Sequence, residues 1–506
     1  MTFNMNYYDM LNTSPKIQLP NKEKLMKTRL LTLLLALLLF ASPLLSCGGE
    51  PLNETVNDNI SQDISGDTAG TDRISVDPLD AIGTFDFDGK DFRVVTCKKF
   101  FFSPYDVEEE NGELLNDTAY QRNAAMEERY NIKMDYEMLE GSAGEAGNAL
   151  IKSVTAGDHL YSVAIVHPFI GLTKLIGGGY TYDWNKVPHV DYTKEWWNQS
   201  FNKELRIGDI LPCASGDFVY FNSGAIYFNK DLMSNYNMEN PYDLVYDGTW
   251  TWDKLGEMSV VAAADLNGDG VMDESDQYGY SIMNHHRMVP VTYSCGIVTS
   301  SLNDEGYPVL DNMASEKMVD VVNMYYKLLF ENKGTLLPKN ELEPFRAGRI
   351  LFLHYVTQNA VALRDVEFDF GILPQPKFDT AQEEYYSMAQ SNVMVIPSDI
   401  EDIDMAGVIS EALAIYSNQY VLPALYETTF EHKYLRDEDS IAMFDIIKNS
   451  LIYDKLWNYA EGNSAVYFLT ALMGKKSTDL ISYYESCHGA AEAAMAALYD
   501  SVLGKN

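Results

Sequence analysis

The chain has 506 residues, of which 46% are hydrophobic and 12% aromatic, so it can build buried cores and is too long for a single one. Its 74 acidic residues against 37 basic ones give a formal net charge of -37. This composition excludes a disordered chain, and because the charge repels phosphate backbones it excludes nucleic acid as a partner.

An apolar segment near the start indicates export. Lys27 and Arg29 precede the run "LLTLLLALLLFA", residues 30–41, which has the length of a signal-peptide core and is short for a stable membrane span. The following "LLSC", residues 44–47, resembles a bacterial lipobox, in which the cysteine receives a diacylglycerol. An ordinary signal peptide followed by a chance cysteine is the alternative.

These features predict a lipoprotein. Residues 26–46 are the expected lipoprotein signal peptide, Cys47 is the expected lipidation site, and residues 1–25 are a possible over-extended start. Because two acyl chains anchor a protein stably, we expect it on the extracellular face of the cell membrane, or in the periplasm if the source has an outer membrane.

Residues 47–78 are polar and predict a flexible tether. After the tether, strand patterns at 91–97, 131–139 and 160–166 alternate with helical patterns at 114–130 and 146–157. The first helix has a candidate cap at Asp117 or Thr118. This alternation is typical of a doubly wound α/β sheet.

The second part of the chain repeats the alternation. A strand runs into a helix over 223–233, and Thr251 is expected to cap a helix that turns Trp252, Leu255 and Met258 inward. Further strands are expected at 278–283, 350–355, 368–376 and 393–397, with helices at 315–334 and 405–416 and a helical remainder.

Several stretches, in order along the chain, resemble the extracellular solute-binding proteins of ATP-driven (ABC) importers, in particular the lipid-anchored, sugar-type, maltodextrin-binding-protein-like branch. They are "GELLNDTAYQRNAAMEERYNI", "VTAGDHLYSVAIV", "GAIYFNKDLM", "FRAGRILFLHY", "DFGILPQPKFD" and "PALYETTFEHKYLRDEDSIAMFDII". One departure is "VAIV", where relatives often carry an acidic residue.

The resemblance implies a two-lobed periplasmic-binding-protein type II α/β fold, each lobe a doubly wound sheet. Lobe 1 would comprise 79–222 and 388–428, lobe 2 would comprise 223–387, and 429–506 would be a helical C-terminal region packing on the lobes. It further implies a monomer without catalysis of its own, which hands a captured solute to the permease subunits of an ABC transporter.

Ligands of doubly wound sheets bind beyond the carboxyl ends of the strands, and this rule selects the candidate site. A carbohydrate suits the aromatic, amide, imidazole and carboxylate groups found in these loops, although another small solute, such as a peptide, remains open. The candidate ligand-binding residues are Phe102, Tyr105, His167, Asp217, Phe218, Asn284, His285, Tyr355 and Gln358.

The four tryptophans of "EWWNQS" and "TWTW" are interpreted as core residues. GxSxG, HExxH, Walker and GxGxxG enzyme motifs are absent from the sequence. A lipid-anchored glycoside hydrolase with a structural calcium is the alternative function, and a calcium-dependent adhesion protein is a third. Cys97, Cys213, Cys295 and Cys487 allow three disulfide pairings, with buried free thiols favoured.

The loop "DLNGDGVMDESD" has the spacing of a calcium site. The expected ligands are Asp265, Asn267, Asp269, the Val271 carbonyl, Asp273 and Asp276, while Gly270 permits the turn. An aspartate in the twelfth place is shorter than the usual glutamate, and a metal-free acidic turn is the alternative. The sequence therefore predicts a structural Ca²⁺ that fixes one connection of lobe 2.

Overall fold

The computed structural model describes residues 78–98, 107–283, 286–357, 362–363, 365–426, 438–459 and 463–505. The predictions on the signal peptide, the tether up to residue 77, Cys47, Phe102, Tyr105, Asn284, His285 and Gln358 lie outside the described residues, while Pro78 at the end of the predicted tether begins a helix. By its internal contacts, Ser75–Asn506 forms one compact unit. No helix in the described ranges is both long and apolar enough to span a bilayer.

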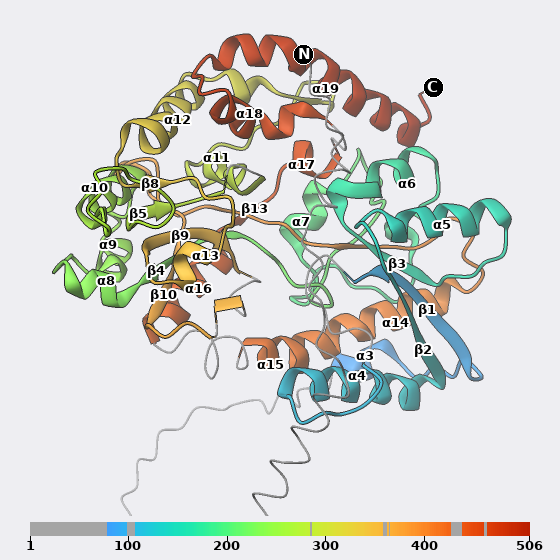
Figure 1. Cartoon of the computed structure of the whole chain (residues 1–506). Coiled ribbons are helices and arrows are strands. Elements are labelled where there is room, and N and C mark those ends of the chain that lie inside the picture. The colour runs from blue at the N-terminus through green and yellow to red at the C-terminus, as the bar shows by residue number, and fades with distance from the viewer. Residues whose placement is uncertain are drawn as a thin grey trace, which may run out of the picture. The chain divides into compact units, whose positions relative to one another are not determined.

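The first sheet has the strand order β12-β3-β1-β2. Figure 1 shows its neighbouring strands β3, β1 and β2. Its strands are β1 (Lys90–Cys97), β2 (Ile132–Leu139), β3 (Val163–Val166) and β12 (Val393–Val395). The first three are parallel, and β12 runs antiparallel to β3. The crossovers contain α4 (Leu114–Tyr130) and α5 (Glu145–Ala156), so the predicted strand and helix alternation is confirmed.

The helix α4 begins earlier than the predicted cap. Its N-cap is Glu113, and Asp117 lies inside the first turn, where its carboxylate accepts the main-chain N–H of Asn111 at 2.8 Å. The prediction of a cap at Asp117 or Thr118 is wrong because the helix extends backwards and buries Leu115. Asp117 instead folds the preceding loop onto the helix.

The second sheet is mixed, with the order β10-β4-β9-β5-β8. Its strands are β4 (Gly224–Asn229), β5 (Tyr278–Ser281), β8 (Thr335–Leu336), β9 (Ile350–Val356) and β10 (Phe370–Pro374). β4 pairs antiparallel with β9 and β10, whereas β5 is parallel to β8 and β9. The fold is thus α/β with two principal mixed sheets.

Two helices cover this second sheet next to β5. They are α10 (Trp252–Ala262) and α12 (Glu316–Tyr326), which continues as a π-helical turn over Lys327–Glu331. α10 lies so close to the sheet that a Cβ on Gly279 would meet the Ser259 Cα at 2.0 Å. The predicted cap is confirmed, since the Thr251 side chain accepts the Lys254 N–H, and Trp252, Leu255 and Met258 are buried.

The other elements connect or cover the two sheets. The helices are α3 (Pro78–Ile82), α6 (Thr173–Gly177), α7 (Gln199–Glu204), α8 (Lys230–Asn235), α9 (Pro241–Tyr246), α11 (Pro290–Ser294), α13 (Glu343–Arg346), α14 (Ile403–Tyr416), α15 (Leu422–Tyr426), α16 (Glu438–Asn449), α17 (Lys455–Tyr459), α18 (Phe468–Gly474) and α19 (Leu480–Leu503). The short strands are β6 (Ser301–Leu302), β7 (Pro308–Val309), β11 (Ser387–Met388) and β13 (Leu451–Ile452).

Two segments connect the sheets and pair with each other. Asn222, just before β4, and Gln390, just before β12, exchange two main-chain hydrogen bonds of 2.7 Å each. The strand β13 then pairs with β11 beside them. We call residues 214–223 and 389–392 the crossing segments.

Each sheet has its own hydrophobic cluster, and the C-terminal helix α19 contributes to both. Ala491 and Met495 belong to the cluster of the second sheet, and Leu498 and Tyr499 to that of the first. In Figure 1 this helix is the long red one at the C-terminus. The C-terminal region therefore packs against elements of both sheets.

The predicted core tryptophans are confirmed. Trp196, Trp197, Trp250 and Trp252 are all at most 8% exposed. The indole N–H groups of Trp196 and Trp197 both donate to the buried Glu411 carboxylate, at 2.8 and 2.7 Å. The four cysteines of the described region are free thiols, three of them buried.

Candidate ligand-binding site

The ends of two strands locate the candidate site. β3 ends at Val166, which pairs with Val393 directly after one crossing segment. β9 leads into Thr357, whose main-chain N–H donates to the Ser223 carbonyl of the other crossing segment at 2.9 Å. The carboxyl ends of β3 in the first sheet and β9 in the second sheet therefore border the paired crossing segments. A ligand of a doubly wound fold is expected at such strand ends.

His167 directly follows β3 and is 7% exposed. Its Nδ1 accepts the main-chain N–H of Phe169 at 3.2 Å, and burial lowers the pKa of the imidazole to about 3. The ring is therefore neutral at physiological pH, and with Nδ1 as acceptor its proton lies on Nε2. A neutral imidazole can hydrogen-bond an uncharged hydroxyl without carrying a charge into the site.

An aromatic stack stands beside His167. Phe169 stacks on Trp457 of α17, with ring centroids 4.7 Å apart and an 18° angle between the planes, and Tyr467 meets Phe169 edge-on at 5.6 Å. His167 itself meets Trp457 edge-on at 6.5 Å. The C-terminal region thus supplies an indole to the end of β3.

Asn392 lies opposite His167, because the antiparallel register pairs Val393 with Val166. It is 4% exposed, and its side-chain Oδ1 has no hydrogen-bond partner among the described residues. Its main-chain carbonyl accepts the Ser215 hydroxyl at 3.4 Å. A buried acceptor without a partner costs free energy, so this oxygen is a candidate for a ligand or water contact.

At the second sheet, Tyr355 of β9 is 6% exposed and lies under the guanidinium of Arg287, 4.7 Å from the ring centroid. Arg287 also bonds Glu341 through two nitrogens, at 2.7 and 3.3 Å. Burial raises the pKa of Glu341 above its ordinary value, because it outweighs the opposing effect of the Arg287 charge. The arrangement fixes the Tyr355 ring through a partly buried ion pair.

Asp217 and Phe218 lie in a crossing segment. The Asp217 carboxylate accepts the Asn418 amide N–H at 2.7 Å, and burial raises the pKa of Asp217 to about 6. Phe218 is fully buried and meets Trp197 edge-on at 5.7 Å, so its ring serves core packing in this structure. Of the nine predicted ligand residues, His167 and Tyr355 lie at the strand ends identified above.

Sequence reasoning did not select Asn392, Arg287 or Trp457. A signal for Asn392 existed, since the amino end of an antiparallel strand lies at the same sheet edge as the carboxyl ends of its neighbours. Arg287 follows the predicted Asn284 and His285 closely. Trp457 has no such local signal, because only the packing of α17 brings it to Phe169.

The acidic loop closes on itself through its side chains. Asp265 accepts the N–H groups of Gly268 and Gly270 at 2.7 and 2.8 Å, and the fully buried Asp276 accepts those of Leu266 and Asp273 at 2.9 and 2.8 Å. Asn267 and Asp269 bond N–H groups two residues ahead, as does Asp273, while Val271 is exposed. In the described ranges, no three His, Cys, Asp or Glu side chains are grouped so that they could hold a metal ion.

No protein-family model and no curated protein sequence matches the chain. Solved structures do match it. A cyclo/maltodextrin-binding protein complexed with maltotetraose gives a TM-score of 0.55 at 14% identity, covering 82% of this chain and 97% of that one. The cyclic alpha-maltosyl-1,6-maltose binding protein of Arthrobacter globiformis gives 0.54 at 13%, covering 82% and 99%.

A third match is an ABC substrate-binding protein from Listeria monocytogenes in complex with cycloalternan. Its TM-score is 0.52 at 13% identity, and the match covers 83% of this chain and 99% of that one. At such identities the likeness establishes the fold alone. Since nearly the whole of each known chain is covered, the shared fold extends through both sheets.

Proposed function

We propose that this chain, which has the fold of the ABC substrate-binding proteins, is a lipid-anchored extracellular solute-binding protein. It captures a carbohydrate and delivers it to the permease subunits of an ABC transporter, without catalysis of its own. The observation that carries the proposal is the fold itself, with the carboxyl ends of β3 and β9 both bordering the crossing segments. The matched proteins named above that hold ligands hold oligosaccharides.

The chemistry at the end of β3 supports a carbohydrate. Asn392 offers a buried carbonyl oxygen that a sugar hydroxyl could satisfy, and His167 is neutral. Trp457 and Phe169 are aromatic neighbours of a kind that packs against sugar C–H faces. Hydroxyls need paired partners once buried, whereas a charged solute would need a counter-charge that His167 does not carry.

The membrane anchor is part of the proposal and rests on the sequence. The apolar run at 30–41 followed by Cys47 supports acylation and attachment to the outer face of the membrane. Mass spectrometry of the exported protein should find a diacylglycerol on Cys47. A mature protein that begins elsewhere, with an unmodified thiol, would contradict this anchor.

We also propose that the loop 265–276 holds a structural Ca²⁺. Six of its side chains carry carboxylate or amide oxygens, the ligand type that Ca²⁺ prefers, and all of them except Glu274 accept loop N–H groups that curve the chain. A carboxylate oxygen that accepts one N–H retains a further lone pair for a cation. The ion would brace the connection between α10 and β5.

Thermal denaturation of the chain from residue 48 onward tests the solute class. A panel of intact oligosaccharides, monosaccharides and short peptides is added, each at concentrations up to the millimolar range. One oligosaccharide at 100 times its Kd should raise the free energy of unfolding by about 2.7 kcal/mol. Stabilisation by peptides and by no sugar would contradict the carbohydrate assignment, while leaving a solute-binding role.

A further inference from the structure

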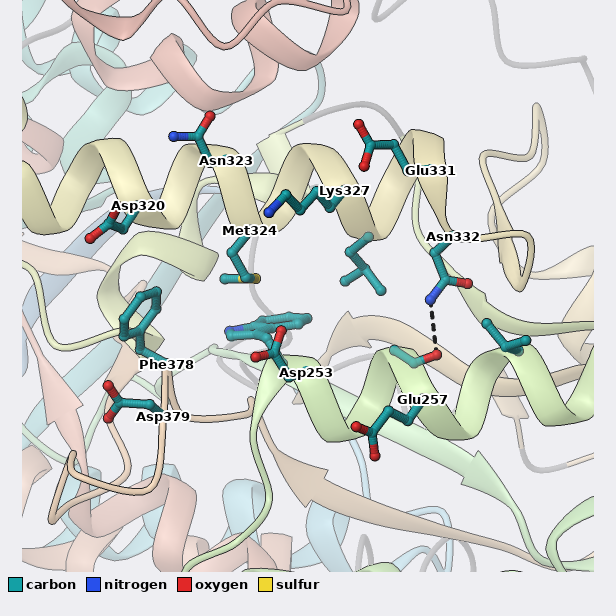
Figure 2. A pocket seen from close by; sticks show the side chains of 14 residues that line it. Asp253, Glu257, Asp320, Asn323, Met324, Lys327, Glu331, Asn332, Phe378 and Asp379 are labelled. Atoms are coloured by element: carbon teal, nitrogen blue, oxygen red, sulfur yellow. Dashed lines mark hydrogen bonds between the residues drawn. The ribbon is translucent and has the colours of Figure 1, made fainter.

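A groove runs between α10 and α12 on the second sheet's helical layer (Figure 2). Its volume is about 940 Å³, and none of the predicted ligand residues lines it. The lining residues on α10 are Trp252, Asp253, Gly256, Glu257 and Val260, and those on α12 and its continuation are Asp320, Asn323, Met324, Lys327, Leu328 and Glu331. Both sets have the three- and four-residue spacing of a helix-packing face.

The floor of the groove is formed where the two helices touch. A Cβ on Gly256 would lie 3.3 Å from both Leu328 and Asn332, and the Asn332 amide donates to the Gly256 carbonyl at 2.9 Å. In Figure 2 this hydrogen bond joins the two helices below Glu331. Trp252 and Leu328 are buried, while Met324 and Phe378 are half-buried and keep apolar surface open to the groove.

Exposed apolar side chains lie in the groove and after it in the sequence. Val260 lines the groove and is 49% exposed, whereas the neighbouring Val261 is 55% exposed but is not one of the lining residues. Leu266, Val271 and Met272 follow in the acidic loop and are each at least 40% exposed. An exposed valine beside the half-buried Met324 and Phe378 gives the groove an apolar surface of the kind that marks an interaction site.

The rim of the groove is acidic. Asp253, Glu257, Asp320, Glu331 and Asp379 line it, whereas Lys327 is the one basic lining residue. None of these five carboxylates forms an ion pair within the described part of the chain. Lys317 stands at one end, with its ammonium 5.8 Å from the centre of the Phe378 ring. A partner with cationic flanks would neutralise this charge, and an anionic lipid surface would be repelled.

We propose that the groove binds an amphipathic helix of a partner protein, with an apolar stripe against Met324, Val260 and Phe378 and Lys or Arg on both flanks. The lining residues of α12 run from 320 to 331, which corresponds to about 18 Å, or roughly three turns of a docked helix. Such a helix would contact both α10 and α12. This surface is separate from the proposed carbohydrate site.

A synthetic helix tests the proposal on the exported protein. The probe is a 16-residue amphipathic peptide of about equal Leu and Lys content, compared by titration calorimetry with a scrambled peptide of the same composition and with a Leu/Glu version. The matched variants are Val260→Lys, inside the groove, and Val261→Lys, one residue outside it. Both variants replace an exposed valine and add one positive charge. Circular dichroism checks that both proteins remain folded.

We expect the amphipathic Leu/Lys peptide to bind at least about tenfold more tightly than the other two peptides. Val260→Lys should lower the affinity for the Leu/Lys peptide about tenfold, because a valine side chain would no longer be buried by the peptide. Val261→Lys should change this affinity by less than about twofold. Equal effects of the two variants, no effect of either, or equal binding of the scrambled peptide would overturn the proposal. So would a dimer of the chain that Val260→Lys dissociates, since a second copy would then fill the groove.

Discussion

Asp217→Asn should remove a pH dependence of stability. Burial raises the pKa of Asp217 from 3.8 to about 6, against the hydrogen bond from Asn418, which lowers it. The folded state therefore binds this proton more tightly than the unfolded state between pH 4 and 6, so stability falls as the pH rises through that range and then levels off. A shift of about two units corresponds to about 3 kcal/mol, which we discount to about 1–3 kcal/mol because the side chain is partly exposed.

The assay is urea unfolding at pH values from 4 to 8. Asparagine keeps an acceptor for the Asn418 amide but cannot ionise, so the variant should be more stable than the parent at pH 7 to 8 and should lack the decline between pH 4 and 6. Asp209→Asn, at an exposed carboxylate, is the matched control and should follow the parent. Equal slopes for the parent and Asp217→Asn would refute the reasoning.

Three further predictions concern other buried or acidic groups. Asn392→Leu should leave the free protein as stable as the parent or slightly more stable, because an unpaired buried oxygen is removed, while the affinity for the bound sugar falls about tenfold or more in calorimetry. Asp454→Ala should lower the free energy of unfolding by at least about 3 kcal/mol. The reason is that Tyr293 OH and the main-chain N–H groups of Thr299 and Leu456 would lose a charged acceptor. The control variant Asp304→Ala, at an exposed position, should change the free energy of unfolding by less than about 0.5 kcal/mol. Removal of Ca²⁺ by a chelator should lower the melting temperature of the parent and leave that of Asp265→Ala unchanged, and an unaltered parent would contradict the proposed metal loop.

Much of the fold follows from local patterns in the sequence. The strand at 91–97 and the helix at 114–130 appear as predicted, because hydrophobic periodicity reports burial directly. The cap of this helix was misjudged because Asp117 has the residue type of a cap, yet the helix already begins at Leu114 and buries Leu115. Burial is a tertiary property, and a single sequence reports it only on average.

Some residues of the candidate site could be predicted from the local sequence, and others could not. His167 and Tyr355 could be selected from the strand-end rule, since each follows or ends a strand that the sequence identifies. Trp457 could not, because its place beside Phe169 depends on how α17 packs against elements far away in the chain. The Arg287–Glu341 pair was missed for the same reason, as neither residue carries a local mark of its partner.

The central claim is that this chain binds an oligosaccharide and leaves it intact, and titration calorimetry followed by sugar analysis tests it most directly. The exported protein is titrated with the oligosaccharide that gives the largest thermal stabilisation, and the sugar is then recovered and analysed. We predict saturable binding of one sugar per chain and recovery of the unchanged sugar. Release of new reducing ends would show a glycoside hydrolase, and the absence of saturable binding to any sugar would contradict the account.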